Sequence, residues 1–457
     1  MTSAKKRIII LSPPFYSHFH PLKTLGKALK AQGAQVGVAC SEGFRREIEA
    51  AGLRFYPLNI NTNQNTGIAK NTDQDREEKK RLEEFFEATY HGPVKTLITQ
   101  GEHRIRDMFS NPGELIHALR KLQETQEGDL FIVDQLSYGA TLALIGLEIP
   151  FITFCPPHPA TIQSKEGVNG LTEHWPAVLE PSEEEKRELK NKQEEVNQRF
   201  RKAFTEVFHH HFPHREIPGG FFESPFSLTS PRGVLFNYPS FPDDGHSKGK
   251  ERERGVPAYY LHYCFEPEEL KEPLRSRVKK EPGRKVLISF GTFLSERRDV
   301  IERLMEGFLD QEDDWHIYVA VGGNSEFFNR FDSRRVTKAS FLPQKALMPH
   351  MDLVVHHGGA NSFTETLYYG KPMMILPFSS DQFAVAFDAQ ENKIGAVLDP
   401  NHITKEAFDA AMEKLRSREV NQALQFWREK AVEKGPRKGA RWILELMSQE
   451  SMGMPPG

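Results

Sequence analysis

Short apolar runs alternate with segments of helical periodicity at the start of the chain. Residues 7–11 and 35–40 are short, nearly continuous apolar runs, so we predict a buried strand at each. Between them, residues 22–29 place Leu and Ala side chains on one helical face, and Gly33 follows as a stop signal. Residues 12–21 are rich in Pro and aromatic residues, which predicts a loop. Strand, helix and strand in this order predict a βαβ unit with parallel strands.

The alternation continues after this unit and restarts in the second part of the chain. Residues 62–82 are polar and predict an insertion loop leading into a helix, and the charged residues 238–256 predict a surface loop near a domain boundary. Residues 182–208 predict a long amphipathic helix that starts with a Ser182–Glu185 capping box. Two runs of alternation predict two doubly wound α/β domains that face each other across a cleft. The further elements expected are strands at 129–134, 151–154, 286–290, 315–321, 353–356 and 373–376, and helices at 44–51, 140–147, 300–309 and 363–369.

Composition excludes several classes of protein. The 457 residues carry 60 Lys and Arg against 63 Asp and Glu, for a net charge of −3, which argues against a dedicated nucleic-acid binder. No apolar run approaches the ~20 residues that cross a bilayer, and residues 8–11 are too short for the core of a signal peptide. Cys40, Cys155 and Cys264 are too widely spaced for a disulfide framework or a metal site. We therefore expect a soluble, cytoplasmic protein.

The loops that follow strands are the places to look for chemistry, because ligands of such sheets bind outside the carboxyl ends of the strands. No GxGxxG follows the first strand and no GxxxxGK[ST] occurs, which argues against a dinucleotide oxidoreductase and a P-loop NTPase. His18 follows the first strand and Asp134 ends another, so the two could form a dyad in which the carboxylate orients a basic imidazole. The alternative is a loop histidine and an unrelated helix cap.

The segment 356–365 (HHGGANSFTE) connects a predicted strand to a predicted helix. Glycines let backbone amides approach a ligand, and a helix N-terminus favours an anion. His357, Asn361 and Ser362 add side-chain donors, so the segment predicts a diphosphate cradle. The alternative is local, because Ser362 and Glu365 also have the spacing of a capping box. The adjacent histidines also suggest a metal, but no third ligand has a suitable spacing.

Three further loops carry polar or aromatic residues after strands. Asp381 and Gln382 could bind vicinal hydroxyls of a sugar, or could form an ordinary turn and helix cap. Residues 289–292 end in Gly-Thr and could present an amide and a hydroxyl to a phosphate. Phe341 could stack on a planar base, or could be a core aromatic. Consecutive histidines point in different directions and so rarely bind one ion together. We therefore interpret the histidines within 209–214 as a solvated or acceptor-lining segment.

Taken in chain order, these loops resemble the nucleotide-sugar-dependent glycosyltransferases with the GT-B fold. The most similar group is the UDP-glycosyltransferase superfamily, including its bacterial macrolide and polyketide members. The resemblance covers most of the chain in organisation and is strongest from 285 to 400. The residues that carry it are SHFHPL (17–22), SFGT (289–292), FLPQ (341–344), HGGANSFTE (357–365) and DQ (381–382).

The resemblance implies a role for each of these positions. His18 matches the general base and Asp134 its acidic partner. Phe341 stands where the family usually has a base-stacking Trp, and Glu365 matches the ligand of the ribose hydroxyls. The departures are Ser17 for the usual Gly, Phe341 for Trp, and Ala360 for Met or Trp, so a UDP or dTDP donor is the default and GDP stays open. The remaining matches are Gln344 near the nucleotide, Thr292, His357, Gly358, Gly359, Asn361 and Ser362 at the diphosphate, and Asp381 and Gln382 at the donor sugar.

The resemblance also implies a domain plan and an activity. We expect an acceptor-binding Rossmann-like domain over 1–265, a nucleotide-sugar-binding Rossmann-like domain over 266–420, and C-terminal helices over 421–450 that pack back on the first domain. The expected enzyme is an inverting, metal-independent O-glycosyltransferase of the hexosyltransferase type, acting on an apolar small molecule such as a polyketide or macrolide. It would need no cofactor beyond the nucleotide sugar, would insert in no membrane, and would be a monomer or homodimer. The alternatives are a nucleotide-sugar epimerase-like enzyme and a non-catalytic nucleotide-sugar-binding accessory protein.

Overall fold

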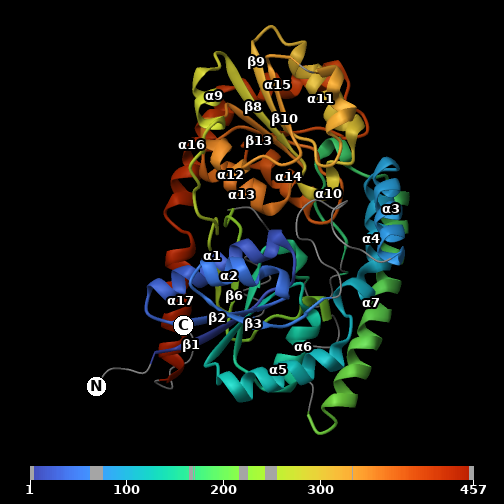
Figure 1. The fold of residues 1–457 in the computed structure, drawn as a ribbon. Coiled ribbons are helices and arrows are strands. Elements are labelled where there is room, and N and C mark those ends of the chain that lie inside the picture. The colour runs from blue at the N-terminus through green and yellow to red at the C-terminus, as the bar shows by residue number, and fades with distance from the viewer. Residues whose placement is uncertain are drawn as a thin grey trace.

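The chain forms two halves, each built on a parallel β-sheet (Figure 1). The structure is a computed structural model that describes residues 5–61, 76–163, 168, 170–215, 225–241, 255–331 and 333–451. Both sheets have the same strand arrangement. The first strand of each sheet lies in its interior, the next two strands add on one side, and the remaining strands add on the other side. This confirms the prediction of two doubly wound α/β units. The boundaries proposed at 265 and 420 stay predictions.

The first sheet has seven strands in the order β3-β2-β1-β4-β5-β6-β7, and every neighbouring pair is parallel. Along β1, alternate side chains enter two different cores: Ile8 and Ile10 pack with α1, whereas Ile9 and Leu11 pack with α5 and α6. Helices therefore cover both faces of the sheet. The strands are β1 (Arg7–Leu11), β2 (Gln35–Cys40), β3 (Arg54–Pro57), β4 (Leu130–Asp134), β5 (Phe151–Cys155), β6 (Val234–Phe236) and β7 (Ala258–Tyr260). The helices of this half are α1 (Tyr16–Ala31), α2 (Arg45–Ala50), α3 (Arg76–Tyr90), α4 (Pro93–Met108), α5 (Pro112–Gln126), α6 (Tyr138–Gly146) and α7 (Glu183–His211).

The second sheet has six parallel strands in the order β10-β9-β8-β11-β12-β13. In both sheets the winding reverses at one pair of strands, β1 with β4 and β8 with β11, and such a reversal is where doubly wound sheets bind ligands. The strands are β8 (Arg284–Ser289), β9 (Trp315–Ala320), β10 (Val336–Ala339), β11 (Leu353–His356), β12 (Met373–Ile375) and β13 (Gly395–Val397). The helices are α9 (Leu274–Lys280), α10 (Gly291–Leu294), α11 (Arg298–Leu309), α12 (Gln344–Leu347), α13 (Ala360–Tyr368), α14 (Gln382–Glu391), α15 (Lys405–Arg416), α16 (Arg418–Val432) and α17 (Pro436–Ser451).

The last helix, α17, belongs in space to the first half, although it follows the second half in the chain (Figure 1). Ala440 and Ile443 are buried in the same core as the strand residues Ile8 and Ile10. Where the chain returns, the Gly435 N–H donates to the carbonyl of Leu261 over 2.7 Å. The return of the C-terminal segment to the first half is therefore made by specific packing.

Several predicted elements differ from the structure in their bounds. The long helix α7 starts with the predicted capping box, since the Ser182 side chain accepts from the Glu185 amide and the Glu185 side chain accepts from the Ser182 amide. The predicted loop over 12–21 is wrong, because α1 already starts at Tyr16 and contains Pro21. Most of the polar segments 62–82 and 238–256 lies outside the described residues. No helix in the part of the chain that the structure describes is long and apolar enough to cross a membrane.

Candidate active site

A histidine and an aspartate meet at the winding reversal of the first sheet. His18 lies in the first turn of α1 and Asp134 is the last residue of β4, and His18 Nδ1 is 2.8 Å from Asp134 Oδ2. Asp134 is fully buried, whereas 14% of the His18 side chain is exposed. The Leu136 amide donates to Asp134 Oδ1, and the N-cap of α6 is Ser137, so the alternative that Asp134 caps that helix is wrong.

The environment of His18 favours its protonated form. Burial is the largest single influence and lowers the pKa, but the charge and hydrogen bond of Asp134, together with the charge of Asp381, outweigh it and raise the pKa above its usual value. A carboxylate only accepts hydrogen bonds, so Nδ1 of the neutral ring carries the hydrogen and Nε2 carries the lone pair. His18 can therefore take a proton at Nε2 and pass to an imidazolium that Asp134 stabilises.

At the winding reversal of the second sheet, the loop from β11 to α13 is shaped by its glycines. Gly358 has φ +86°, a conformation that favours glycine, and its amide donates to His356 Nδ1 over 3.0 Å. The N-cap of α13 is Gly359, which has no side chain to cap the helix, so the alternative of a Ser362–Glu365 capping box is wrong. Ser362 lies half-buried in the first turn. The start of α13 thus keeps backbone donors of the kind that bind anions.

Both histidines of this loop are held neutral. Burial lowers the pKa of His357 to about 4 and that of His356, with help from its neighbour, to about 3. A Cβ added to Gly359 would lie 2.6 Å from His357 Nε2, so only glycine leaves room for this ring position. His357 Nδ1 is buried without a hydrogen-bond partner among the described residues. A buried polar atom without a partner is costly, and a ligand oxygen would relieve that cost.

Asn361 connects this loop to the turn that carries His18. Its Nδ2 donates to the carbonyl of Ser17 over 2.6 Å, and its Oδ1 accepts from Asn237 Nδ2 over 3.0 Å. Pro21 explains why the carbonyl is available, because Pro21 has no N–H to donate to the residue four positions earlier in the helix. Both ends of the Asn361 amide are therefore engaged by the first half, which the sequence did not indicate.

The predicted nucleotide contacts lie on neighbouring elements of the second half. Phe341 is 69% exposed just before α12, so the alternative of a core aromatic is wrong. Gln344 Nε2 donates to Ser289 Oγ at the end of β8 over 2.5 Å. The side chain of Thr292 lies outside the described part of the structure, and its backbone follows Gly291, which has φ +71°.

Glu365 on α13 carries a carboxyl group with an unusual pKa. Burial raises this pKa from 4.5 to about 7; the charge of Lys345 opposes the effect and that of Glu268 adds to it. Lys345 and Glu268 form an ion pair at 2.5 Å. Glu365 is thus a poorly solvated acceptor, and hydroxyl donors of a ligand would stabilise its charged form.

The two residues predicted at the donor sugar, Asp381 and Gln382, have different surroundings. Gln382 is buried, and its Oε1 accepts from the Phe378 and Ser379 amides over 2.9 and 3.2 Å. It therefore shapes the loop before α14 from within. Asp381 stands at the N-cap position of α14 but its side chain does not cap the helix; Asp381 Oδ2 accepts from the His158 amide of the first half over 2.8 Å.

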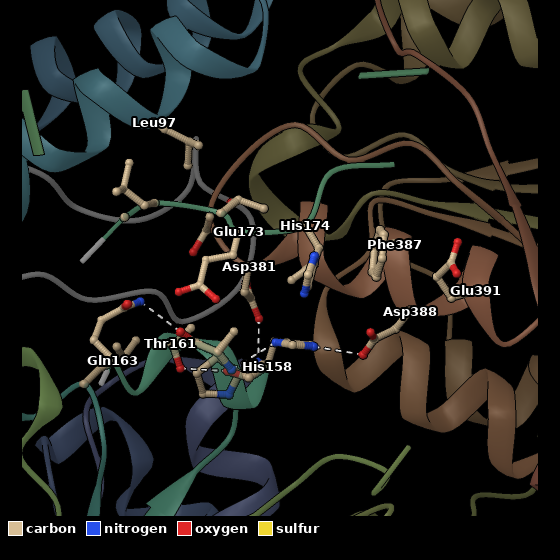
Figure 2. Close-up of a pocket in the computed structure, with 18 of the residues that line it drawn as sticks. Leu97, His158, Thr161, Gln163, Glu173, His174, Asp381, Phe387, Asp388 and Glu391 are labelled. Carbon is tan, nitrogen blue, oxygen red and sulfur yellow. Dashed lines mark hydrogen bonds and ion pairs between the residues drawn. The ribbon is translucent and has the colours of Figure 1, made fainter. Parts of the chain in front are cut away.

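A cavity of about 240 Å³ lies between the first half and α14 (Figure 2). Its walls include Leu136, the residue bound to Asp134 Oδ1, and Asp381 at the start of α14. His174 and Phe387 stack within it, with ring centroids 4.7 Å apart. The cavity therefore reaches the predicted sugar loop at Asp381, and it approaches the histidine–aspartate pair through Leu136.

Sequence reasoning missed His158, which joins the two halves at this cavity. Its position directly after β5, on the carboxyl edge of the first sheet, was the available signal. Of the histidines within 209–214, which we interpret from the sequence as solvated or acceptor-lining, His209, His210 and His214 are exposed, whereas His211 at the end of α7 is half-buried. Within the described residues, no three His, Cys, Asp or Glu side chains come together as a metal site.

Comparison with known proteins identifies relatives of this chain. Residues 329–440 match the family model of the erythromycin biosynthesis protein CIII-like C-terminal domain. Demethyllactenocin mycarosyltransferase of Streptomyces fradiae is 29% identical over 139 residues, which are 30% of this chain and 30% of that enzyme. NDP-glycosyltransferase YjiC of Bacillus subtilis (strain 168) is 21% identical over 419 residues, 90% of each chain.

Solved structures show the same fold over nearly the whole chain. The glycosyltransferase of kitacinnamycin superposes with a TM-score of 0.66 at 20% identity, covering 97% of this chain and 100% of that one. The matching family model spans the loop from β11 to α13 and the start of α14, where the candidate donor residues lie. The chain therefore has the fold of GT-B glycosyltransferases, and its residues 329–440 are similar in sequence to the C-terminal domain of the erythromycin biosynthesis protein CIII-like family.

Proposed function

We propose that this chain is an inverting O-glycosyltransferase that moves a sugar from a nucleoside-diphosphate sugar to a hydroxyl group of a small natural-product acceptor. The observation that carries the proposal is the 2.8 Å pair of His18 and Asp134, because Asp134 also binds the amide of Leu136 in the wall of the cavity that α14 lines from the other side. A base on one side and donor-binding loops on the other are what direct transfer between two substrates requires.

In the proposed reaction, the acceptor oxygen attacks the anomeric carbon of the donor sugar. Nε2 of His18 takes the acceptor's proton, and Asp134 stabilises the imidazolium that forms. The bond from the anomeric carbon to the diphosphate oxygen breaks on the opposite face, so the configuration at that carbon inverts. The products are the glycoside and a nucleoside diphosphate.

The second half supplies groups for the leaving diphosphate. The amides at the start of α13, the side chain of Ser362 and the neutral ring of His357 can donate to its oxygens. We assign the ribose hydroxyls to Glu365 and stacking on the base to Phe341. With these donors, we propose that transfer needs no metal ion.

Two lines of support concern the acceptor. The matching family model is described by erythromycin biosynthesis, and the names of relatives refer to lactenocin and kitacinnamycin chemistry. The cavity beside the base combines apolar residues such as Leu97 and Leu171 with the stacked pair of His174 and Phe387. We therefore propose a polyketide- or macrolide-type acceptor that presents a hydroxyl to His18.

A donor and acceptor panel tests the proposal. The protein is incubated with UDP-, dTDP- and GDP-glucose, each with a set of hydroxylated macrolide and polyketide aglycones, and products are followed by mass spectrometry. We expect a glycoside of inverted anomeric configuration by NMR, and undiminished turnover in EDTA. A change of the sugar without an acceptor would favour an epimerase-like enzyme, and tight binding without any product would favour an accessory protein. A cytoplasmic location stays a prediction.

A further inference from the structure

A carboxylate of the second half, Asp388 on α14, is buried against two donors of the first half. His158 Nε2 lies 2.9 Å from Asp388 Oδ2, as the dashed line in Figure 2 shows, and the Tyr238 hydroxyl donates to the same oxygen over 3.0 Å. The exposed fractions of His158, Tyr238 and Asp388 are 4%, 1% and 8%. A charge buried to this degree is tolerated only when it is well paired, so the three groups depend on one another.

The direction of each bond follows from the surroundings of the His158 ring. The Ala160 amide donates to His158 Nδ1 over 3.0 Å, so Nδ1 carries the lone pair. Nε2 therefore carries the hydrogen and donates it to Asp388. Tyr238 also meets the His158 ring edge to face at 4.7 Å and stacks on Phe363 of α13 at 5.3 Å, which fixes its own position between the halves.

His158 contacts α14 a second time through its backbone. The His158 amide donates to Asp381 Oδ2 over 2.8 Å. Asp381 is the N-cap residue of α14 and lines the cavity. Asp381 and Asp388 are about two helical turns apart and lie on the same face of the helix. His158 can therefore bind both, Asp381 through its amide and Asp388 through its ring. A further contact is the bond from the Ser380 amide to Gln100 Oε1 on α4, at 3.0 Å.

We infer that His158, Asp388 and Tyr238 are positioning residues that fix Asp381 against the donor sugar. The inference rests on the proposed function for the role of Asp381. The side chain of Asp388 and the ring of His158 set the height and rotation of α14 relative to the first half, and Asp381 moves with that helix. The charge of Asp381 also helps to raise the pKa of His18, so the start of α14 lies close to the base.

The proposed positioning role affects the contacts to the donor's sugar and not those to its nucleoside diphosphate. The predicted diphosphate contacts lie in the loop from β11 to α13, whereas the side-chain and backbone bonds of His158 reach Asp388 on α14 and Asp381 at its N-cap. Tyr238 also stacks on Phe363 of α13, so His158 and Asp388 give the cleaner separation. Disturbing the three residues should therefore weaken binding of a nucleotide sugar while binding of the nucleoside diphosphate is preserved. A general loss of folding would instead weaken both ligands together.

The experiment measures the dissociation constants of UDP and UDP-glucose, and of dTDP and dTDP-glucose, by calorimetry. The variants are His158→Phe, which keeps an aromatic ring without nitrogen atoms, Asp388→Asn and Tyr238→Phe. The matched control is His402→Phe, because His402 pairs with Asp399 at 2.7 Å on the surface, where the ring is 80% exposed. For His158→Phe and Asp388→Asn we expect affinity for the nucleotide sugar to fall about tenfold or more, and affinity for the nucleoside diphosphate to change less than about twofold. Tyr238→Phe should lower affinity for the nucleotide sugar by a smaller factor. The control His402→Phe should change neither affinity.

Equal affinities in the variants and the wild type, or equal losses for both ligands, would overturn the inference. If His158→Phe does not fold, Tyr238→Phe and Asp388→Asn decide. A wild type that binds no nucleotide sugar would refute the proposed function instead. In that case, amide hydrogen exchange tests whether Asp388 holds the start of α14 in place. We expect the first amides of α14 to exchange faster in Asp388→Asn than in the wild type. Unchanged exchange would overturn the positioning role.

Discussion

Replacing Glu365 by Gln is expected to stabilise the protein above neutral pH and to weaken its affinity for nucleotide sugars. Burial raises the pKa of this carboxyl group from 4.5 to about 7. In the unfolded chain the group keeps its ordinary value, so between pH 4.5 and about 7 the unfolded chain has lost a proton that the folded chain still holds. The free energy of unfolding therefore falls as the pH rises through this window, and the loss is complete above about pH 7.

The size of the effect follows from the width of that window. The interval from 4.5 to about 7, at about 1.4 kcal/mol per pH unit, corresponds to about 3 kcal/mol of lost stability. Gln has a similar shape and no charge, so Glu365→Gln should recover much of this energy at pH 8.5 and almost none at pH 4. The same substitution removes the acceptor proposed for the ribose hydroxyls. We expect affinity for the nucleotide sugar to fall by about tenfold or more.

Urea unfolding followed by circular dichroism at pH 4, 6 and 8.5 measures the first effect, and calorimetry with the donor measures the second. The control is Glu413→Gln, which removes a carboxylate from an exposed position of α15. The difference in stability between Glu365→Gln and the wild type should grow with pH, whereas the control should show no such trend. A difference that does not depend on pH would refute the reasoning about the buried charge, and unchanged donor affinity would refute the ribose contact.

Three other predictions concern the base, the diphosphate and the last helix. His18→Ala should lower turnover ~10²–10⁴-fold with donor affinity nearly intact, and the loss should be strongly non-additive with that of Asp134→Asn; near-native turnover in His18→Ala would falsify the mechanism. His357→Ala should weaken UDP or dTDP binding by about tenfold in calorimetry, since one phosphate hydrogen bond is lost, and unchanged affinity counts against that contact. Truncation before Arg437 should cost solubility or transferase activity, because Ala440 and Ile443 fill the core of the first half, and a fully active truncated protein would contradict this.

The sequence predicted those parts of the fold that local patterns determine. The buried strands β1, β2 and β4 could be recognised because each is a short apolar run, and α7 because a capping box precedes its apolar stripe. The start of α1 could not, because Pro21 usually marks a helix end or first turn. Here Tyr16 opens the helix, and the carbonyl that Pro21 leaves without a partner is satisfied by Asn361, far away in the sequence.

The candidate site shows the same division between local and distant causes. The strand-end rule suffices to bring His18 and Asp134 to one edge of the sheet. Whether Asn361 and Gln382 point at a ligand or bond to the protein depends on side chains and amides that no short motif reveals. His158 lacked a motif altogether, because its partner Asp388 lies in the other half of the chain.

The return of α17 to the first half makes the second half an insertion, entered after β7 and left before Pro436. The two connecting segments touch, since the Gly435 amide donates to the Leu261 carbonyl over 2.7 Å. Gly435 has φ +95°, and a Cβ there would lie 2.5 Å from the Tyr263 ring, so this crossing is tightly packed. A body tethered at two adjacent points can swing about them but cannot slide away. These two tethers therefore permit a rotation of the inserted half about Leu261 and Gly435 more readily than a translation away from the first half.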